Sequence, residues 1–189
     1  MILEYILLAM LREPKTGYTL KNEFDQGERH FWSAELSQIY PALQRMEKRG
    51  WLKSTLEPSD KGPERRVYSR TKAGAKALSK WLRSDPIVGM ERFAYIAQLI
   101  YMDQLDDLDV TLRFLKKLRD LLADKLELLS SAETAMAALP GFPNKLNNED
   151  FHGRLSLRMG VLSLSAKVQW CDESIQRVSA RLAKERKYA

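Results

Sequence analysis

The stretch that decides the fold is residues 37–50, which read SQIYPALQRMEKRG. Its apolar residues Ile39, Leu43 and Met46 recur at spacings of four and three, so they share one face of a helix. We expect Ser37 to cap this helix, Pro41 to lie in its first turn and Gly50 to end it. The outward face is then polar and carries Gln38, Tyr40, Gln44, Arg45 and Lys48.

Two shorter helices are expected before this one. Residues 2–11 have apolar side chains at positions 2, 3, 6, 7 and 10, the stripe of a buried amphipathic helix, and Pro14 stops it. Thr16 is placed to cap the second helix, whose Leu20 and Phe24 face inward. The bulky residues Phe31 and Trp32 are expected to fill one end of the hydrophobic core, and we call them the plug.

A hairpin and a fourth helix are expected after it. Residues 51–57 and 65–71 are rich in Thr, Val, Tyr and Leu, and the turn-forming segment 58–63 joins them. Thr71 can cap a helix with Ala75, Leu78 and Leu82 on one side. Helix, helix, helix, hairpin, helix is the order of a winged helix-turn-helix. The predicted fold class is mainly α with a small β-hairpin wing.

The sequence of the second half of the chain is typical of long helices. Residues 85–89 form the expected hinge, so the predicted domains are a winged helix-turn-helix over 1–85 and a helical dimerisation domain over 86–189. Helices are expected over 91–105, from a cap at Asp109 to about 139, and over about 150–187, with a loop near 140–148.

The last of these helices carries a heptad repeat. Its apolar residues alternate four and three apart over nearly four heptads, a coiled-coil pattern that requires a partner helix. The partner is either the preceding long helix or a copy in a second subunit. We expect both, with a purely intrachain pair as the alternative. The predicted dimer-interface residues are Leu157, Val161, Leu164, Val168, Cys171, Ile175, Val178 and Leu182.

The net positive charge of the chain lies entirely in its first half. Residues 1–84 contain 16 Lys and Arg against 10 Asp and Glu, whereas residues 85–189 contain 15 of each. A basic patch confined to one module indicates a polyanion-binding surface, although a soluble domain with a basic pI would show the same total.

Catalysis, cofactors and metals find no support in the sequence. His30 and His152 have no partner motif, Cys171 lies on an apolar seam, and no Gly-rich phosphate loop is present. No window reaches the ~18 consecutive apolar residues of a membrane span. Residues 1–11 read as a core helix rather than a signal peptide, and a single cysteine fits the cytoplasm.

The motifs around the decisive stretch resemble those of the PadR family of bacterial transcriptional regulators. The resemblance is specific over about residues 2–83 and weaker over 90–187, where it rests on the helical layout of the longer branch of the family. It is carried by FWSAELSQIYPAL at 31–43, TGY at 16–18, MEKRG at 46–50, KGP at 61–63, Tyr68, and TKAG at 71–74.

This resemblance implies a cytoplasmic homodimer that binds a palindromic operator in double-stranded DNA, often as a repressor. It also implies long C-terminal helices that cross between subunits. Some family members release DNA on binding small aromatic compounds such as phenolic acids. The wing departs from the commonest family pattern because Glu64 places an acid at its tip.

The expected DNA contacts follow from the helix-turn-helix geometry, in which the second helix of the motif enters the major groove. Its amino-terminal residues reach base edges, a side chain of the preceding helix reaches a phosphate, and the wing supplies positive charge. The alternative is a winged helix that docks proteins, but such a docking face should be apolar. The predicted DNA-binding residues are Tyr18, Ser37, Gln38, Tyr40, Pro41, Gln44, Arg45, Lys61, Arg65 and Arg66.

An aromatic effector site is the least determined expectation. The natural location is the junction of the plug, the hinge and the long helices. Aromatic residues at helical spacing more often form core than pocket, so a core role is the alternative. The residues concerned are Phe31, Trp32, Tyr95, Tyr101 and Trp170.

Overall fold

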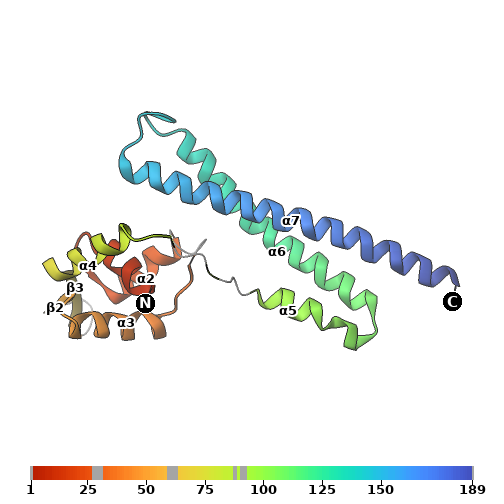
Figure 1. Ribbon diagram of the computed structural model, residues 1–189, viewed down its shortest axis with the longest axis horizontal. Coiled ribbons are helices and arrows are strands. Elements are labelled where there is room, and N and C mark those ends of the chain that lie inside the picture. The colour runs from red at the N-terminus through yellow and green to blue at the C-terminus, as the bar shows by residue number, and fades with distance from the viewer. Residues whose placement is uncertain (1, 27–31, 59–63, 87–88, 90–92, 189) are drawn as a thin grey trace. The chain divides into compact units, whose positions relative to one another are not determined.

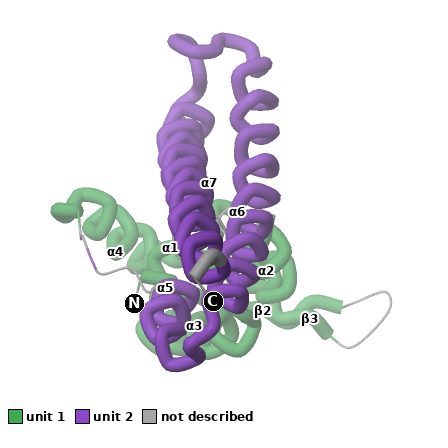
Figure 2. The backbone as a smooth tube through the Cα atoms, turned by 90° about the vertical axis from the view of Figure 1, so that its right-hand side faces the viewer, with its two compact units in different colours: residues 1–88 green, residues 89–189 purple. Residues whose placement is uncertain are grey.

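The computed structural model describes residues 2–26, 32–58, 64–86, 89 and 93–188. The chain divides into two compact units, residues 1–88 and 89–189 (Figure 2).

The first unit has the element order of a winged helix. In chain order it contains α1 (Ile2–Met10), β1 (Lys15–Thr16), α2 (Gly17–Gln26), α3 (Leu36–Lys48), β2 (Leu52–Glu57), β3 (Arg65–Arg70) and α4 (Lys72–Leu82) (Figure 1). The predicted fold class is therefore confirmed for this unit, with three helices before the hairpin and one after it.

The wing is a three-stranded antiparallel sheet in the order β1-β3-β2. The hairpin pairs Leu52 with Arg70 at one end and Glu57 with Arg65 at the other. β1 was not expected from the sequence because it is two residues long and shows no alternation. It pairs Lys15 with Tyr68, which joins the start of α2 to the root of the wing.

The core of this unit lies between its helices. Leu7, Leu20, Phe24, Ile39 and Leu43 are fully buried in it. Trp32 is half-buried and packs against the same core, so it has the structural role of the plug, whereas Phe31 lies outside the described residues.

The expected inner face of α4 was partly wrong. Leu78 is buried, but Ala75 is exposed and Leu82 is 65% exposed. The packed side instead includes Gly74, Ala77 and Trp81, because the Trp81 ring stacks on Tyr5 of α1 at a centroid distance of 5.0 Å.

The start of α3 also differs from expectation. Ser37 is not its cap: the helix begins at Leu36, and Glu35 is the N-cap residue. The backbone N–H of Glu35 donates to Oε1 of Gln38 at 3.0 Å, one half of a capping box. Pro41 consequently lies in the second turn rather than the first, where it has no N–H to donate to the carbonyl of Ser37.

The second unit contains α5 (Ala94–Ile100), the short 3₁₀ helix η2 (Met102–Leu105), α6 (Leu108–Ala137) and α7 (Asn148–Tyr188). One helix was expected over 91–105, but α5 ends at Ile100 and the chain continues as η2. The cap of α6 is Asp107, not Asp109, because its Oδ1 accepts from the N–H groups of Asp109 and Val110. None of the described helices is long and apolar enough to cross a membrane.

The partner of the heptad repeat is α6 of the same chain. α6 and α7 run side by side in opposite directions (Figure 2). Ion pairs join them along their length: Arg186 with Asp109 at 3.0 Å, Arg119 with Asp172 at 3.0 Å, and Arg158 with Glu133 at 3.4 Å. The repeat residues Leu157, Val161, Cys171 and Leu182 are buried, and Leu164, Val168, Ile175 and Val178 are half-buried.

The intrachain pair is therefore present, and it covers much of the repeat. Four of the eight predicted interface residues retain less than 10% of their surface, so a second subunit would first meet their exposed neighbours. A role of the repeat itself between subunits stays a prediction.

Candidate nucleic-acid interface

α3 has one buried and one exposed side. Ile39, Ala42, Leu43 and Met46 are completely buried against the core. The six residues of this helix predicted to contact DNA all lie exposed on the other side, which we call the outer face of α3: Ser37, Gln38, Tyr40, Pro41, Gln44 and Arg45. The structure thus brings these six together on one polar surface.

Gln38 has two tasks on this face. Its Oε1 accepts the N–H of Glu35 and so helps to start the helix. The amide nitrogen is a separate donor, and the amide oxygen has a second lone pair. A contact to a base edge is therefore compatible with the capping role.

Tyr40 lies against the first residue of α2. A Cβ atom on Gly17 would come within 2.5 Å of Cε1 and 2.9 Å of Cζ of the Tyr40 ring. The absence of a side chain at Gly17 thus leaves room for the Tyr40 ring at this place. The neighbouring Tyr18 is 63% exposed at the start of α2, and the Thr16 cap predicted there is confirmed by a 3.0 Å bond from Thr19 N–H to Thr16 Oγ1.

The root of the wing is tied to α3 through Glu47. Ser54 Oγ on β2 donates to Glu47 Oε1 at 2.5 Å, and Arg66 Nη1 on β3 lies 3.7 Å from Glu47 Oε2. Arg65 and Arg66 are exposed, while the predicted contact Lys61 lies outside the described residues. Burial raises the pKa of the neighbouring Tyr68 above its ordinary value.

The carboxyl end of α3 is fixed by two sequence motifs. Gly50 has φ +71°, and the N–H groups of Gly50 and Trp51 donate to the carbonyls of Glu47 and Met46, both at 2.9 Å. This is a Schellman ending, as Gly50 predicted. Thr71 Oγ1 donates to the Gly50 carbonyl at 2.6 Å.

The same Thr71 starts α4, as expected, by accepting the N–H of Gly74 at 3.1 Å. A Cβ atom on Gly74 would lie 2.2 Å from the carbonyl oxygen of Trp51. The segment 71–74 therefore clamps the end of α3 to the start of α4, and its glycine is required by a backbone contact.

One feature next to this face was not predicted from the sequence. Glu4, which interrupts the apolar stripe of α1, is 2% exposed and forms ion pairs with Arg45 of α3 and with Arg49, the residue directly after α3. Arg45 Nε lies 3.0 Å from its Oε1, and Arg49 Nη1 lies 2.7 Å from its Oε2. The signal that could have revealed it is an acid within a buried stripe, because a buried charge requires partners.

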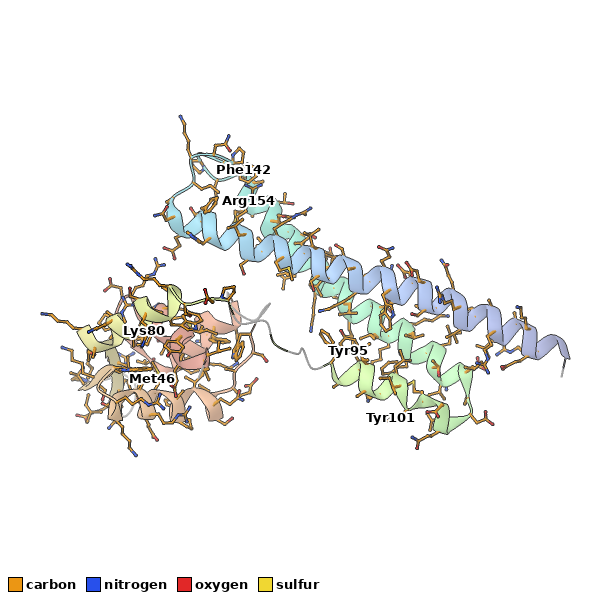
Figure 3. All side chains as sticks on the ribbon, viewed as in Figure 1. Met46, Lys80, Tyr95, Tyr101, Phe142 and Arg154 are labelled. Atoms are coloured by element: carbon orange, nitrogen blue, oxygen red, sulfur yellow. The ribbon has the colours of Figure 1, made fainter. Side chains whose placement is uncertain are left out.

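The predicted effector residues fall in both units of the chain, and Phe31 lies outside the described residues. Tyr95 and Trp170 pack against a cluster of Leu118, Leu122 and Cys171 in the second unit. Tyr101, at the end of α5, is 65% exposed (Figure 3). Trp32 belongs to the core of the first unit.

A helix with an exposed polar and basic face, preceded by a second helix and followed by a hairpin, defines a winged helix-turn-helix protein of the DNA-binding class. Residues 6–80 match the model of the "Transcriptional regulator PadR-like family", and residues 98–179 match that of the "Virulence activator alpha C-term". The chain belongs to this family of transcriptional regulators, which are not enzymes, and has the corresponding C-terminal domain.

Relatives of this kind match along nearly their whole length. The negative transcriptional regulator PadR of Bacillus subtilis is 26% identical over 173 residues, which cover 90% of this chain and 94% of that protein. Its crystal structure with operator DNA has a TM-score of 0.75 at 23% identity and covers 94% of this chain and 99% of that one. The Vibrio cholerae virulence activator AphA has a TM-score of 0.73 at 27% identity, with coverage of 95% and 99%.

Proposed function

We propose that this regulator acts as a homodimer on a palindromic operator, as a repressor. The observation that carries the proposal is the outer face of α3, where polar and basic side chains stand exposed while the opposite side of the helix is completely buried. The Bacillus subtilis relative crystallised with operator DNA supports the same assignment.

The proposed division of contacts follows the chemistry of each side chain. Ser37, Gln38, Tyr40, Pro41 and Gln44 face base edges in the major groove, where the amide of Gln38 suits adenine and the Tyr40 ring suits a thymine methyl. Phosphates are contacted from α2, from the carboxyl half of α3 and from the wing. The residues proposed for phosphates are Tyr18, Arg45, Lys61, Arg65 and Arg66.

A second copy of the chain is the proposed partner of the second unit. Large apolar side chains remain exposed on α6 and α7 next to the heptad repeat, and contiguous exposed apolar surface is typical of a protein–protein interface. On α7 they recur four and three residues apart, so they share a helix face. They are Leu121 (53% exposed), Leu128 (69%), Leu155 (58%), Met159 (64%) and Leu162 (51%).

A small aromatic acid is the proposed effector. The Bacillus subtilis relative has been crystallised with p-coumaric acid, although identity to that chain is 23%. Tyr95 and Trp170 offer half-buried rings in the same cluster of the second unit. An effector changes DNA affinity only through its different affinities for the two conformations.

The test is selection of duplexes from a random-sequence DNA library by the purified protein, followed by footprinting of the selected site. We expect a two-fold symmetric motif whose half-sites are one helical turn, about 34–36 Å, apart. The control is the protein with Arg65 and Arg66 changed to Ala, which should retain dimerisation and lose affinity. Failure to enrich any sequence would contradict the proposal.

The effector is tested in the same assay with p-coumaric acid and, as a matched control, cyclohexanecarboxylic acid, which has the carboxylate but no aromatic ring. Release of DNA by the aromatic acid alone supports the proposal. Equal responses to both acids, or none, would contradict the effector role and leave DNA binding intact.

A further inference from the structure

The buried carboxylate of Glu4 connects the inside of the first unit with the outer face of α3. Its side chain is 2% exposed, whereas those of its partners Arg45 and Arg49 are 52% and 42% exposed. A carboxylate is seldom buried to this degree without ionic partners, because desolvation of an unpaired charge is costly. The two arginines therefore form a half-exposed cover over one acid.

This arrangement leaves donors for another acceptor. Arg45 uses Nε in its bond to Glu4, and a guanidinium has further N–H groups on its two terminal nitrogens. Arg49 uses Nη1, and its guanidinium carbon also lies 5.4 Å from the centroid of the Trp51 ring. Both arginines are thus held in place from below while part of each guanidinium faces outward.

The arrangement also sets the local charge. Glu4, Arg45 and Arg49 together carry one net positive charge instead of the two of the arginines alone. Non-specific attraction to DNA depends on how many phosphates the protein's cations neutralise, and it carries no sequence information. The single acid paired with Arg45 and Arg49 therefore reduces this attraction next to the outer face of α3.

We propose, resting on the DNA-binding function above, that Glu4 is a positioning residue that sets specificity. It directs Arg45 toward the DNA backbone from a fixed base on α1, and it cancels one of the two positive charges of Arg45 and Arg49. The fixed geometry of Arg45 strengthens specific binding. Non-specific binding is weakened, because the protein neutralises one phosphate fewer.

The test compares Glu4→Gln and Arg49→Gln in the full chain by their salt-dependent binding to a random-sequence duplex. Glu4→Gln removes the acid, so the salt slope should become steeper by about one unit. The ratio of the affinities of Glu4→Gln and the parent for the random duplex should then fall about 3.5-fold between about 50 and about 200 mM salt. Arg49→Gln removes a cation, so the slope should become flatter by up to about one unit.

The opposite signs separate this role from a purely structural one. Both substitutions weaken the attachment of α1 to the carboxyl end of α3, Glu4→Gln through both ion pairs and Arg49→Gln through one, so a loss of this attachment alone would move both variants in one direction. Glu13→Gln, which makes the same change of charge in the exposed turn after α1, is the matched control and should alter the slope less than Glu4→Gln. Thermal unfolding of each variant monitors the fold.

Glu4→Gln should also lower the ratio of affinities for the selected operator and the random duplex. An unchanged or flatter slope in Glu4→Gln would overturn the inference. If Glu4→Gln does not fold, an unchanged slope in Arg49→Gln overturns it instead. A parent protein that binds neither duplex would overturn the proposed function rather than this inference alone.

Discussion

Gly74 and Gly17 show at the residue scale how close contacts determine the geometry of the interface. A Cβ atom at Gly74 would meet the Trp51 carbonyl at 2.2 Å, and one at Gly17 would meet the Tyr40 ring at 2.5 Å. The first neighbour is backbone and the second is the far part of a side chain. The two glycines should therefore respond differently to the same substitution.

Gly74→Ala should destabilise the first unit by about 1–3 kcal/mol, because the new methyl group forces the end of α3 and the start of α4 apart. Chemical denaturation followed by tryptophan fluorescence measures this free energy of unfolding. Gly89→Ala is the matched control, since a Cβ atom there meets nothing within 4 Å. Equal stability of the two variants would contradict the clamp.

Gly17→Ala should leave stability nearly unchanged and lower operator affinity, because the Tyr40 ring can move away but then leaves its place on the outer face of α3. A double-mutant cycle with Tyr40→Ala checks this assignment by fluorescence anisotropy. Gly17→Ala should have little further effect once the ring is absent. An equal loss of affinity in both backgrounds would show that Tyr40 does not mediate the effect.

At the scale of elements, periodicity and stop signals predicted the helices and the hairpin. The first residue of a helix was harder to predict, because several nearby side chains could serve as its N-cap. Ser37 and Asp109 were good capping residues by type, but Glu35 and Asp107 cap their helices. Several acceptable caps stood within three residues, and the packing of the apolar stripe selects among them. The two-residue β1 exists only through its pairing with β3, so no local pattern could reveal it.

The wing should act as a source of charge rather than of sequence reading. Arg66→Ala is expected to weaken binding to all duplexes and to flatten the salt slope by about one unit, because one phosphate contact is lost. Lys80→Ala removes the same charge from the exposed surface of α4 and should have a smaller effect. Titrations of operator and random duplexes at several salt concentrations measure both. A change in base preference in Arg66→Ala would contradict this role.

At the scale of the whole molecule, the net positive charge belongs to residues 1–84 and the long helices belong to the second unit. This division was visible in the sequence. The partner of the heptad repeat was not visible in the sequence, because the pattern shows only that the helix packs against another helix. It does not show whether that helix belongs to the same chain or to a second copy. The structure answers this for one partner, α6 of the same chain.

Cys171 makes the α6–α7 pair sensitive to alkaline pH. Burial raises the pKa of its thiol above the ordinary value of 9.0, so the folded state holds this proton more tightly than the unfolded chain. The resulting stability is present below the unfolded pKa and is lost as pH rises through the folded one. The stability of the parent relative to Cys171→Ala should therefore fall progressively as pH rises from the ordinary thiol pKa of 9.0 through the raised pKa of the folded protein. A pH-independent difference in denaturation midpoints would contradict this.

The central claim is that the outer face of α3 reads DNA bases. Gln38→Glu tests it most directly, because a glutamate keeps the acceptor for the Glu35 N–H, loses the amide donor and adds one negative charge, which lowers the affinity for every duplex but by itself does not change base preference. The measurement is selection of duplexes from a random library by the parent and by this variant. The account predicts that base preference changes at one position in each half-site of a two-fold motif. The same motif selected by both proteins, with affinity reduced equally for every duplex, would contradict it.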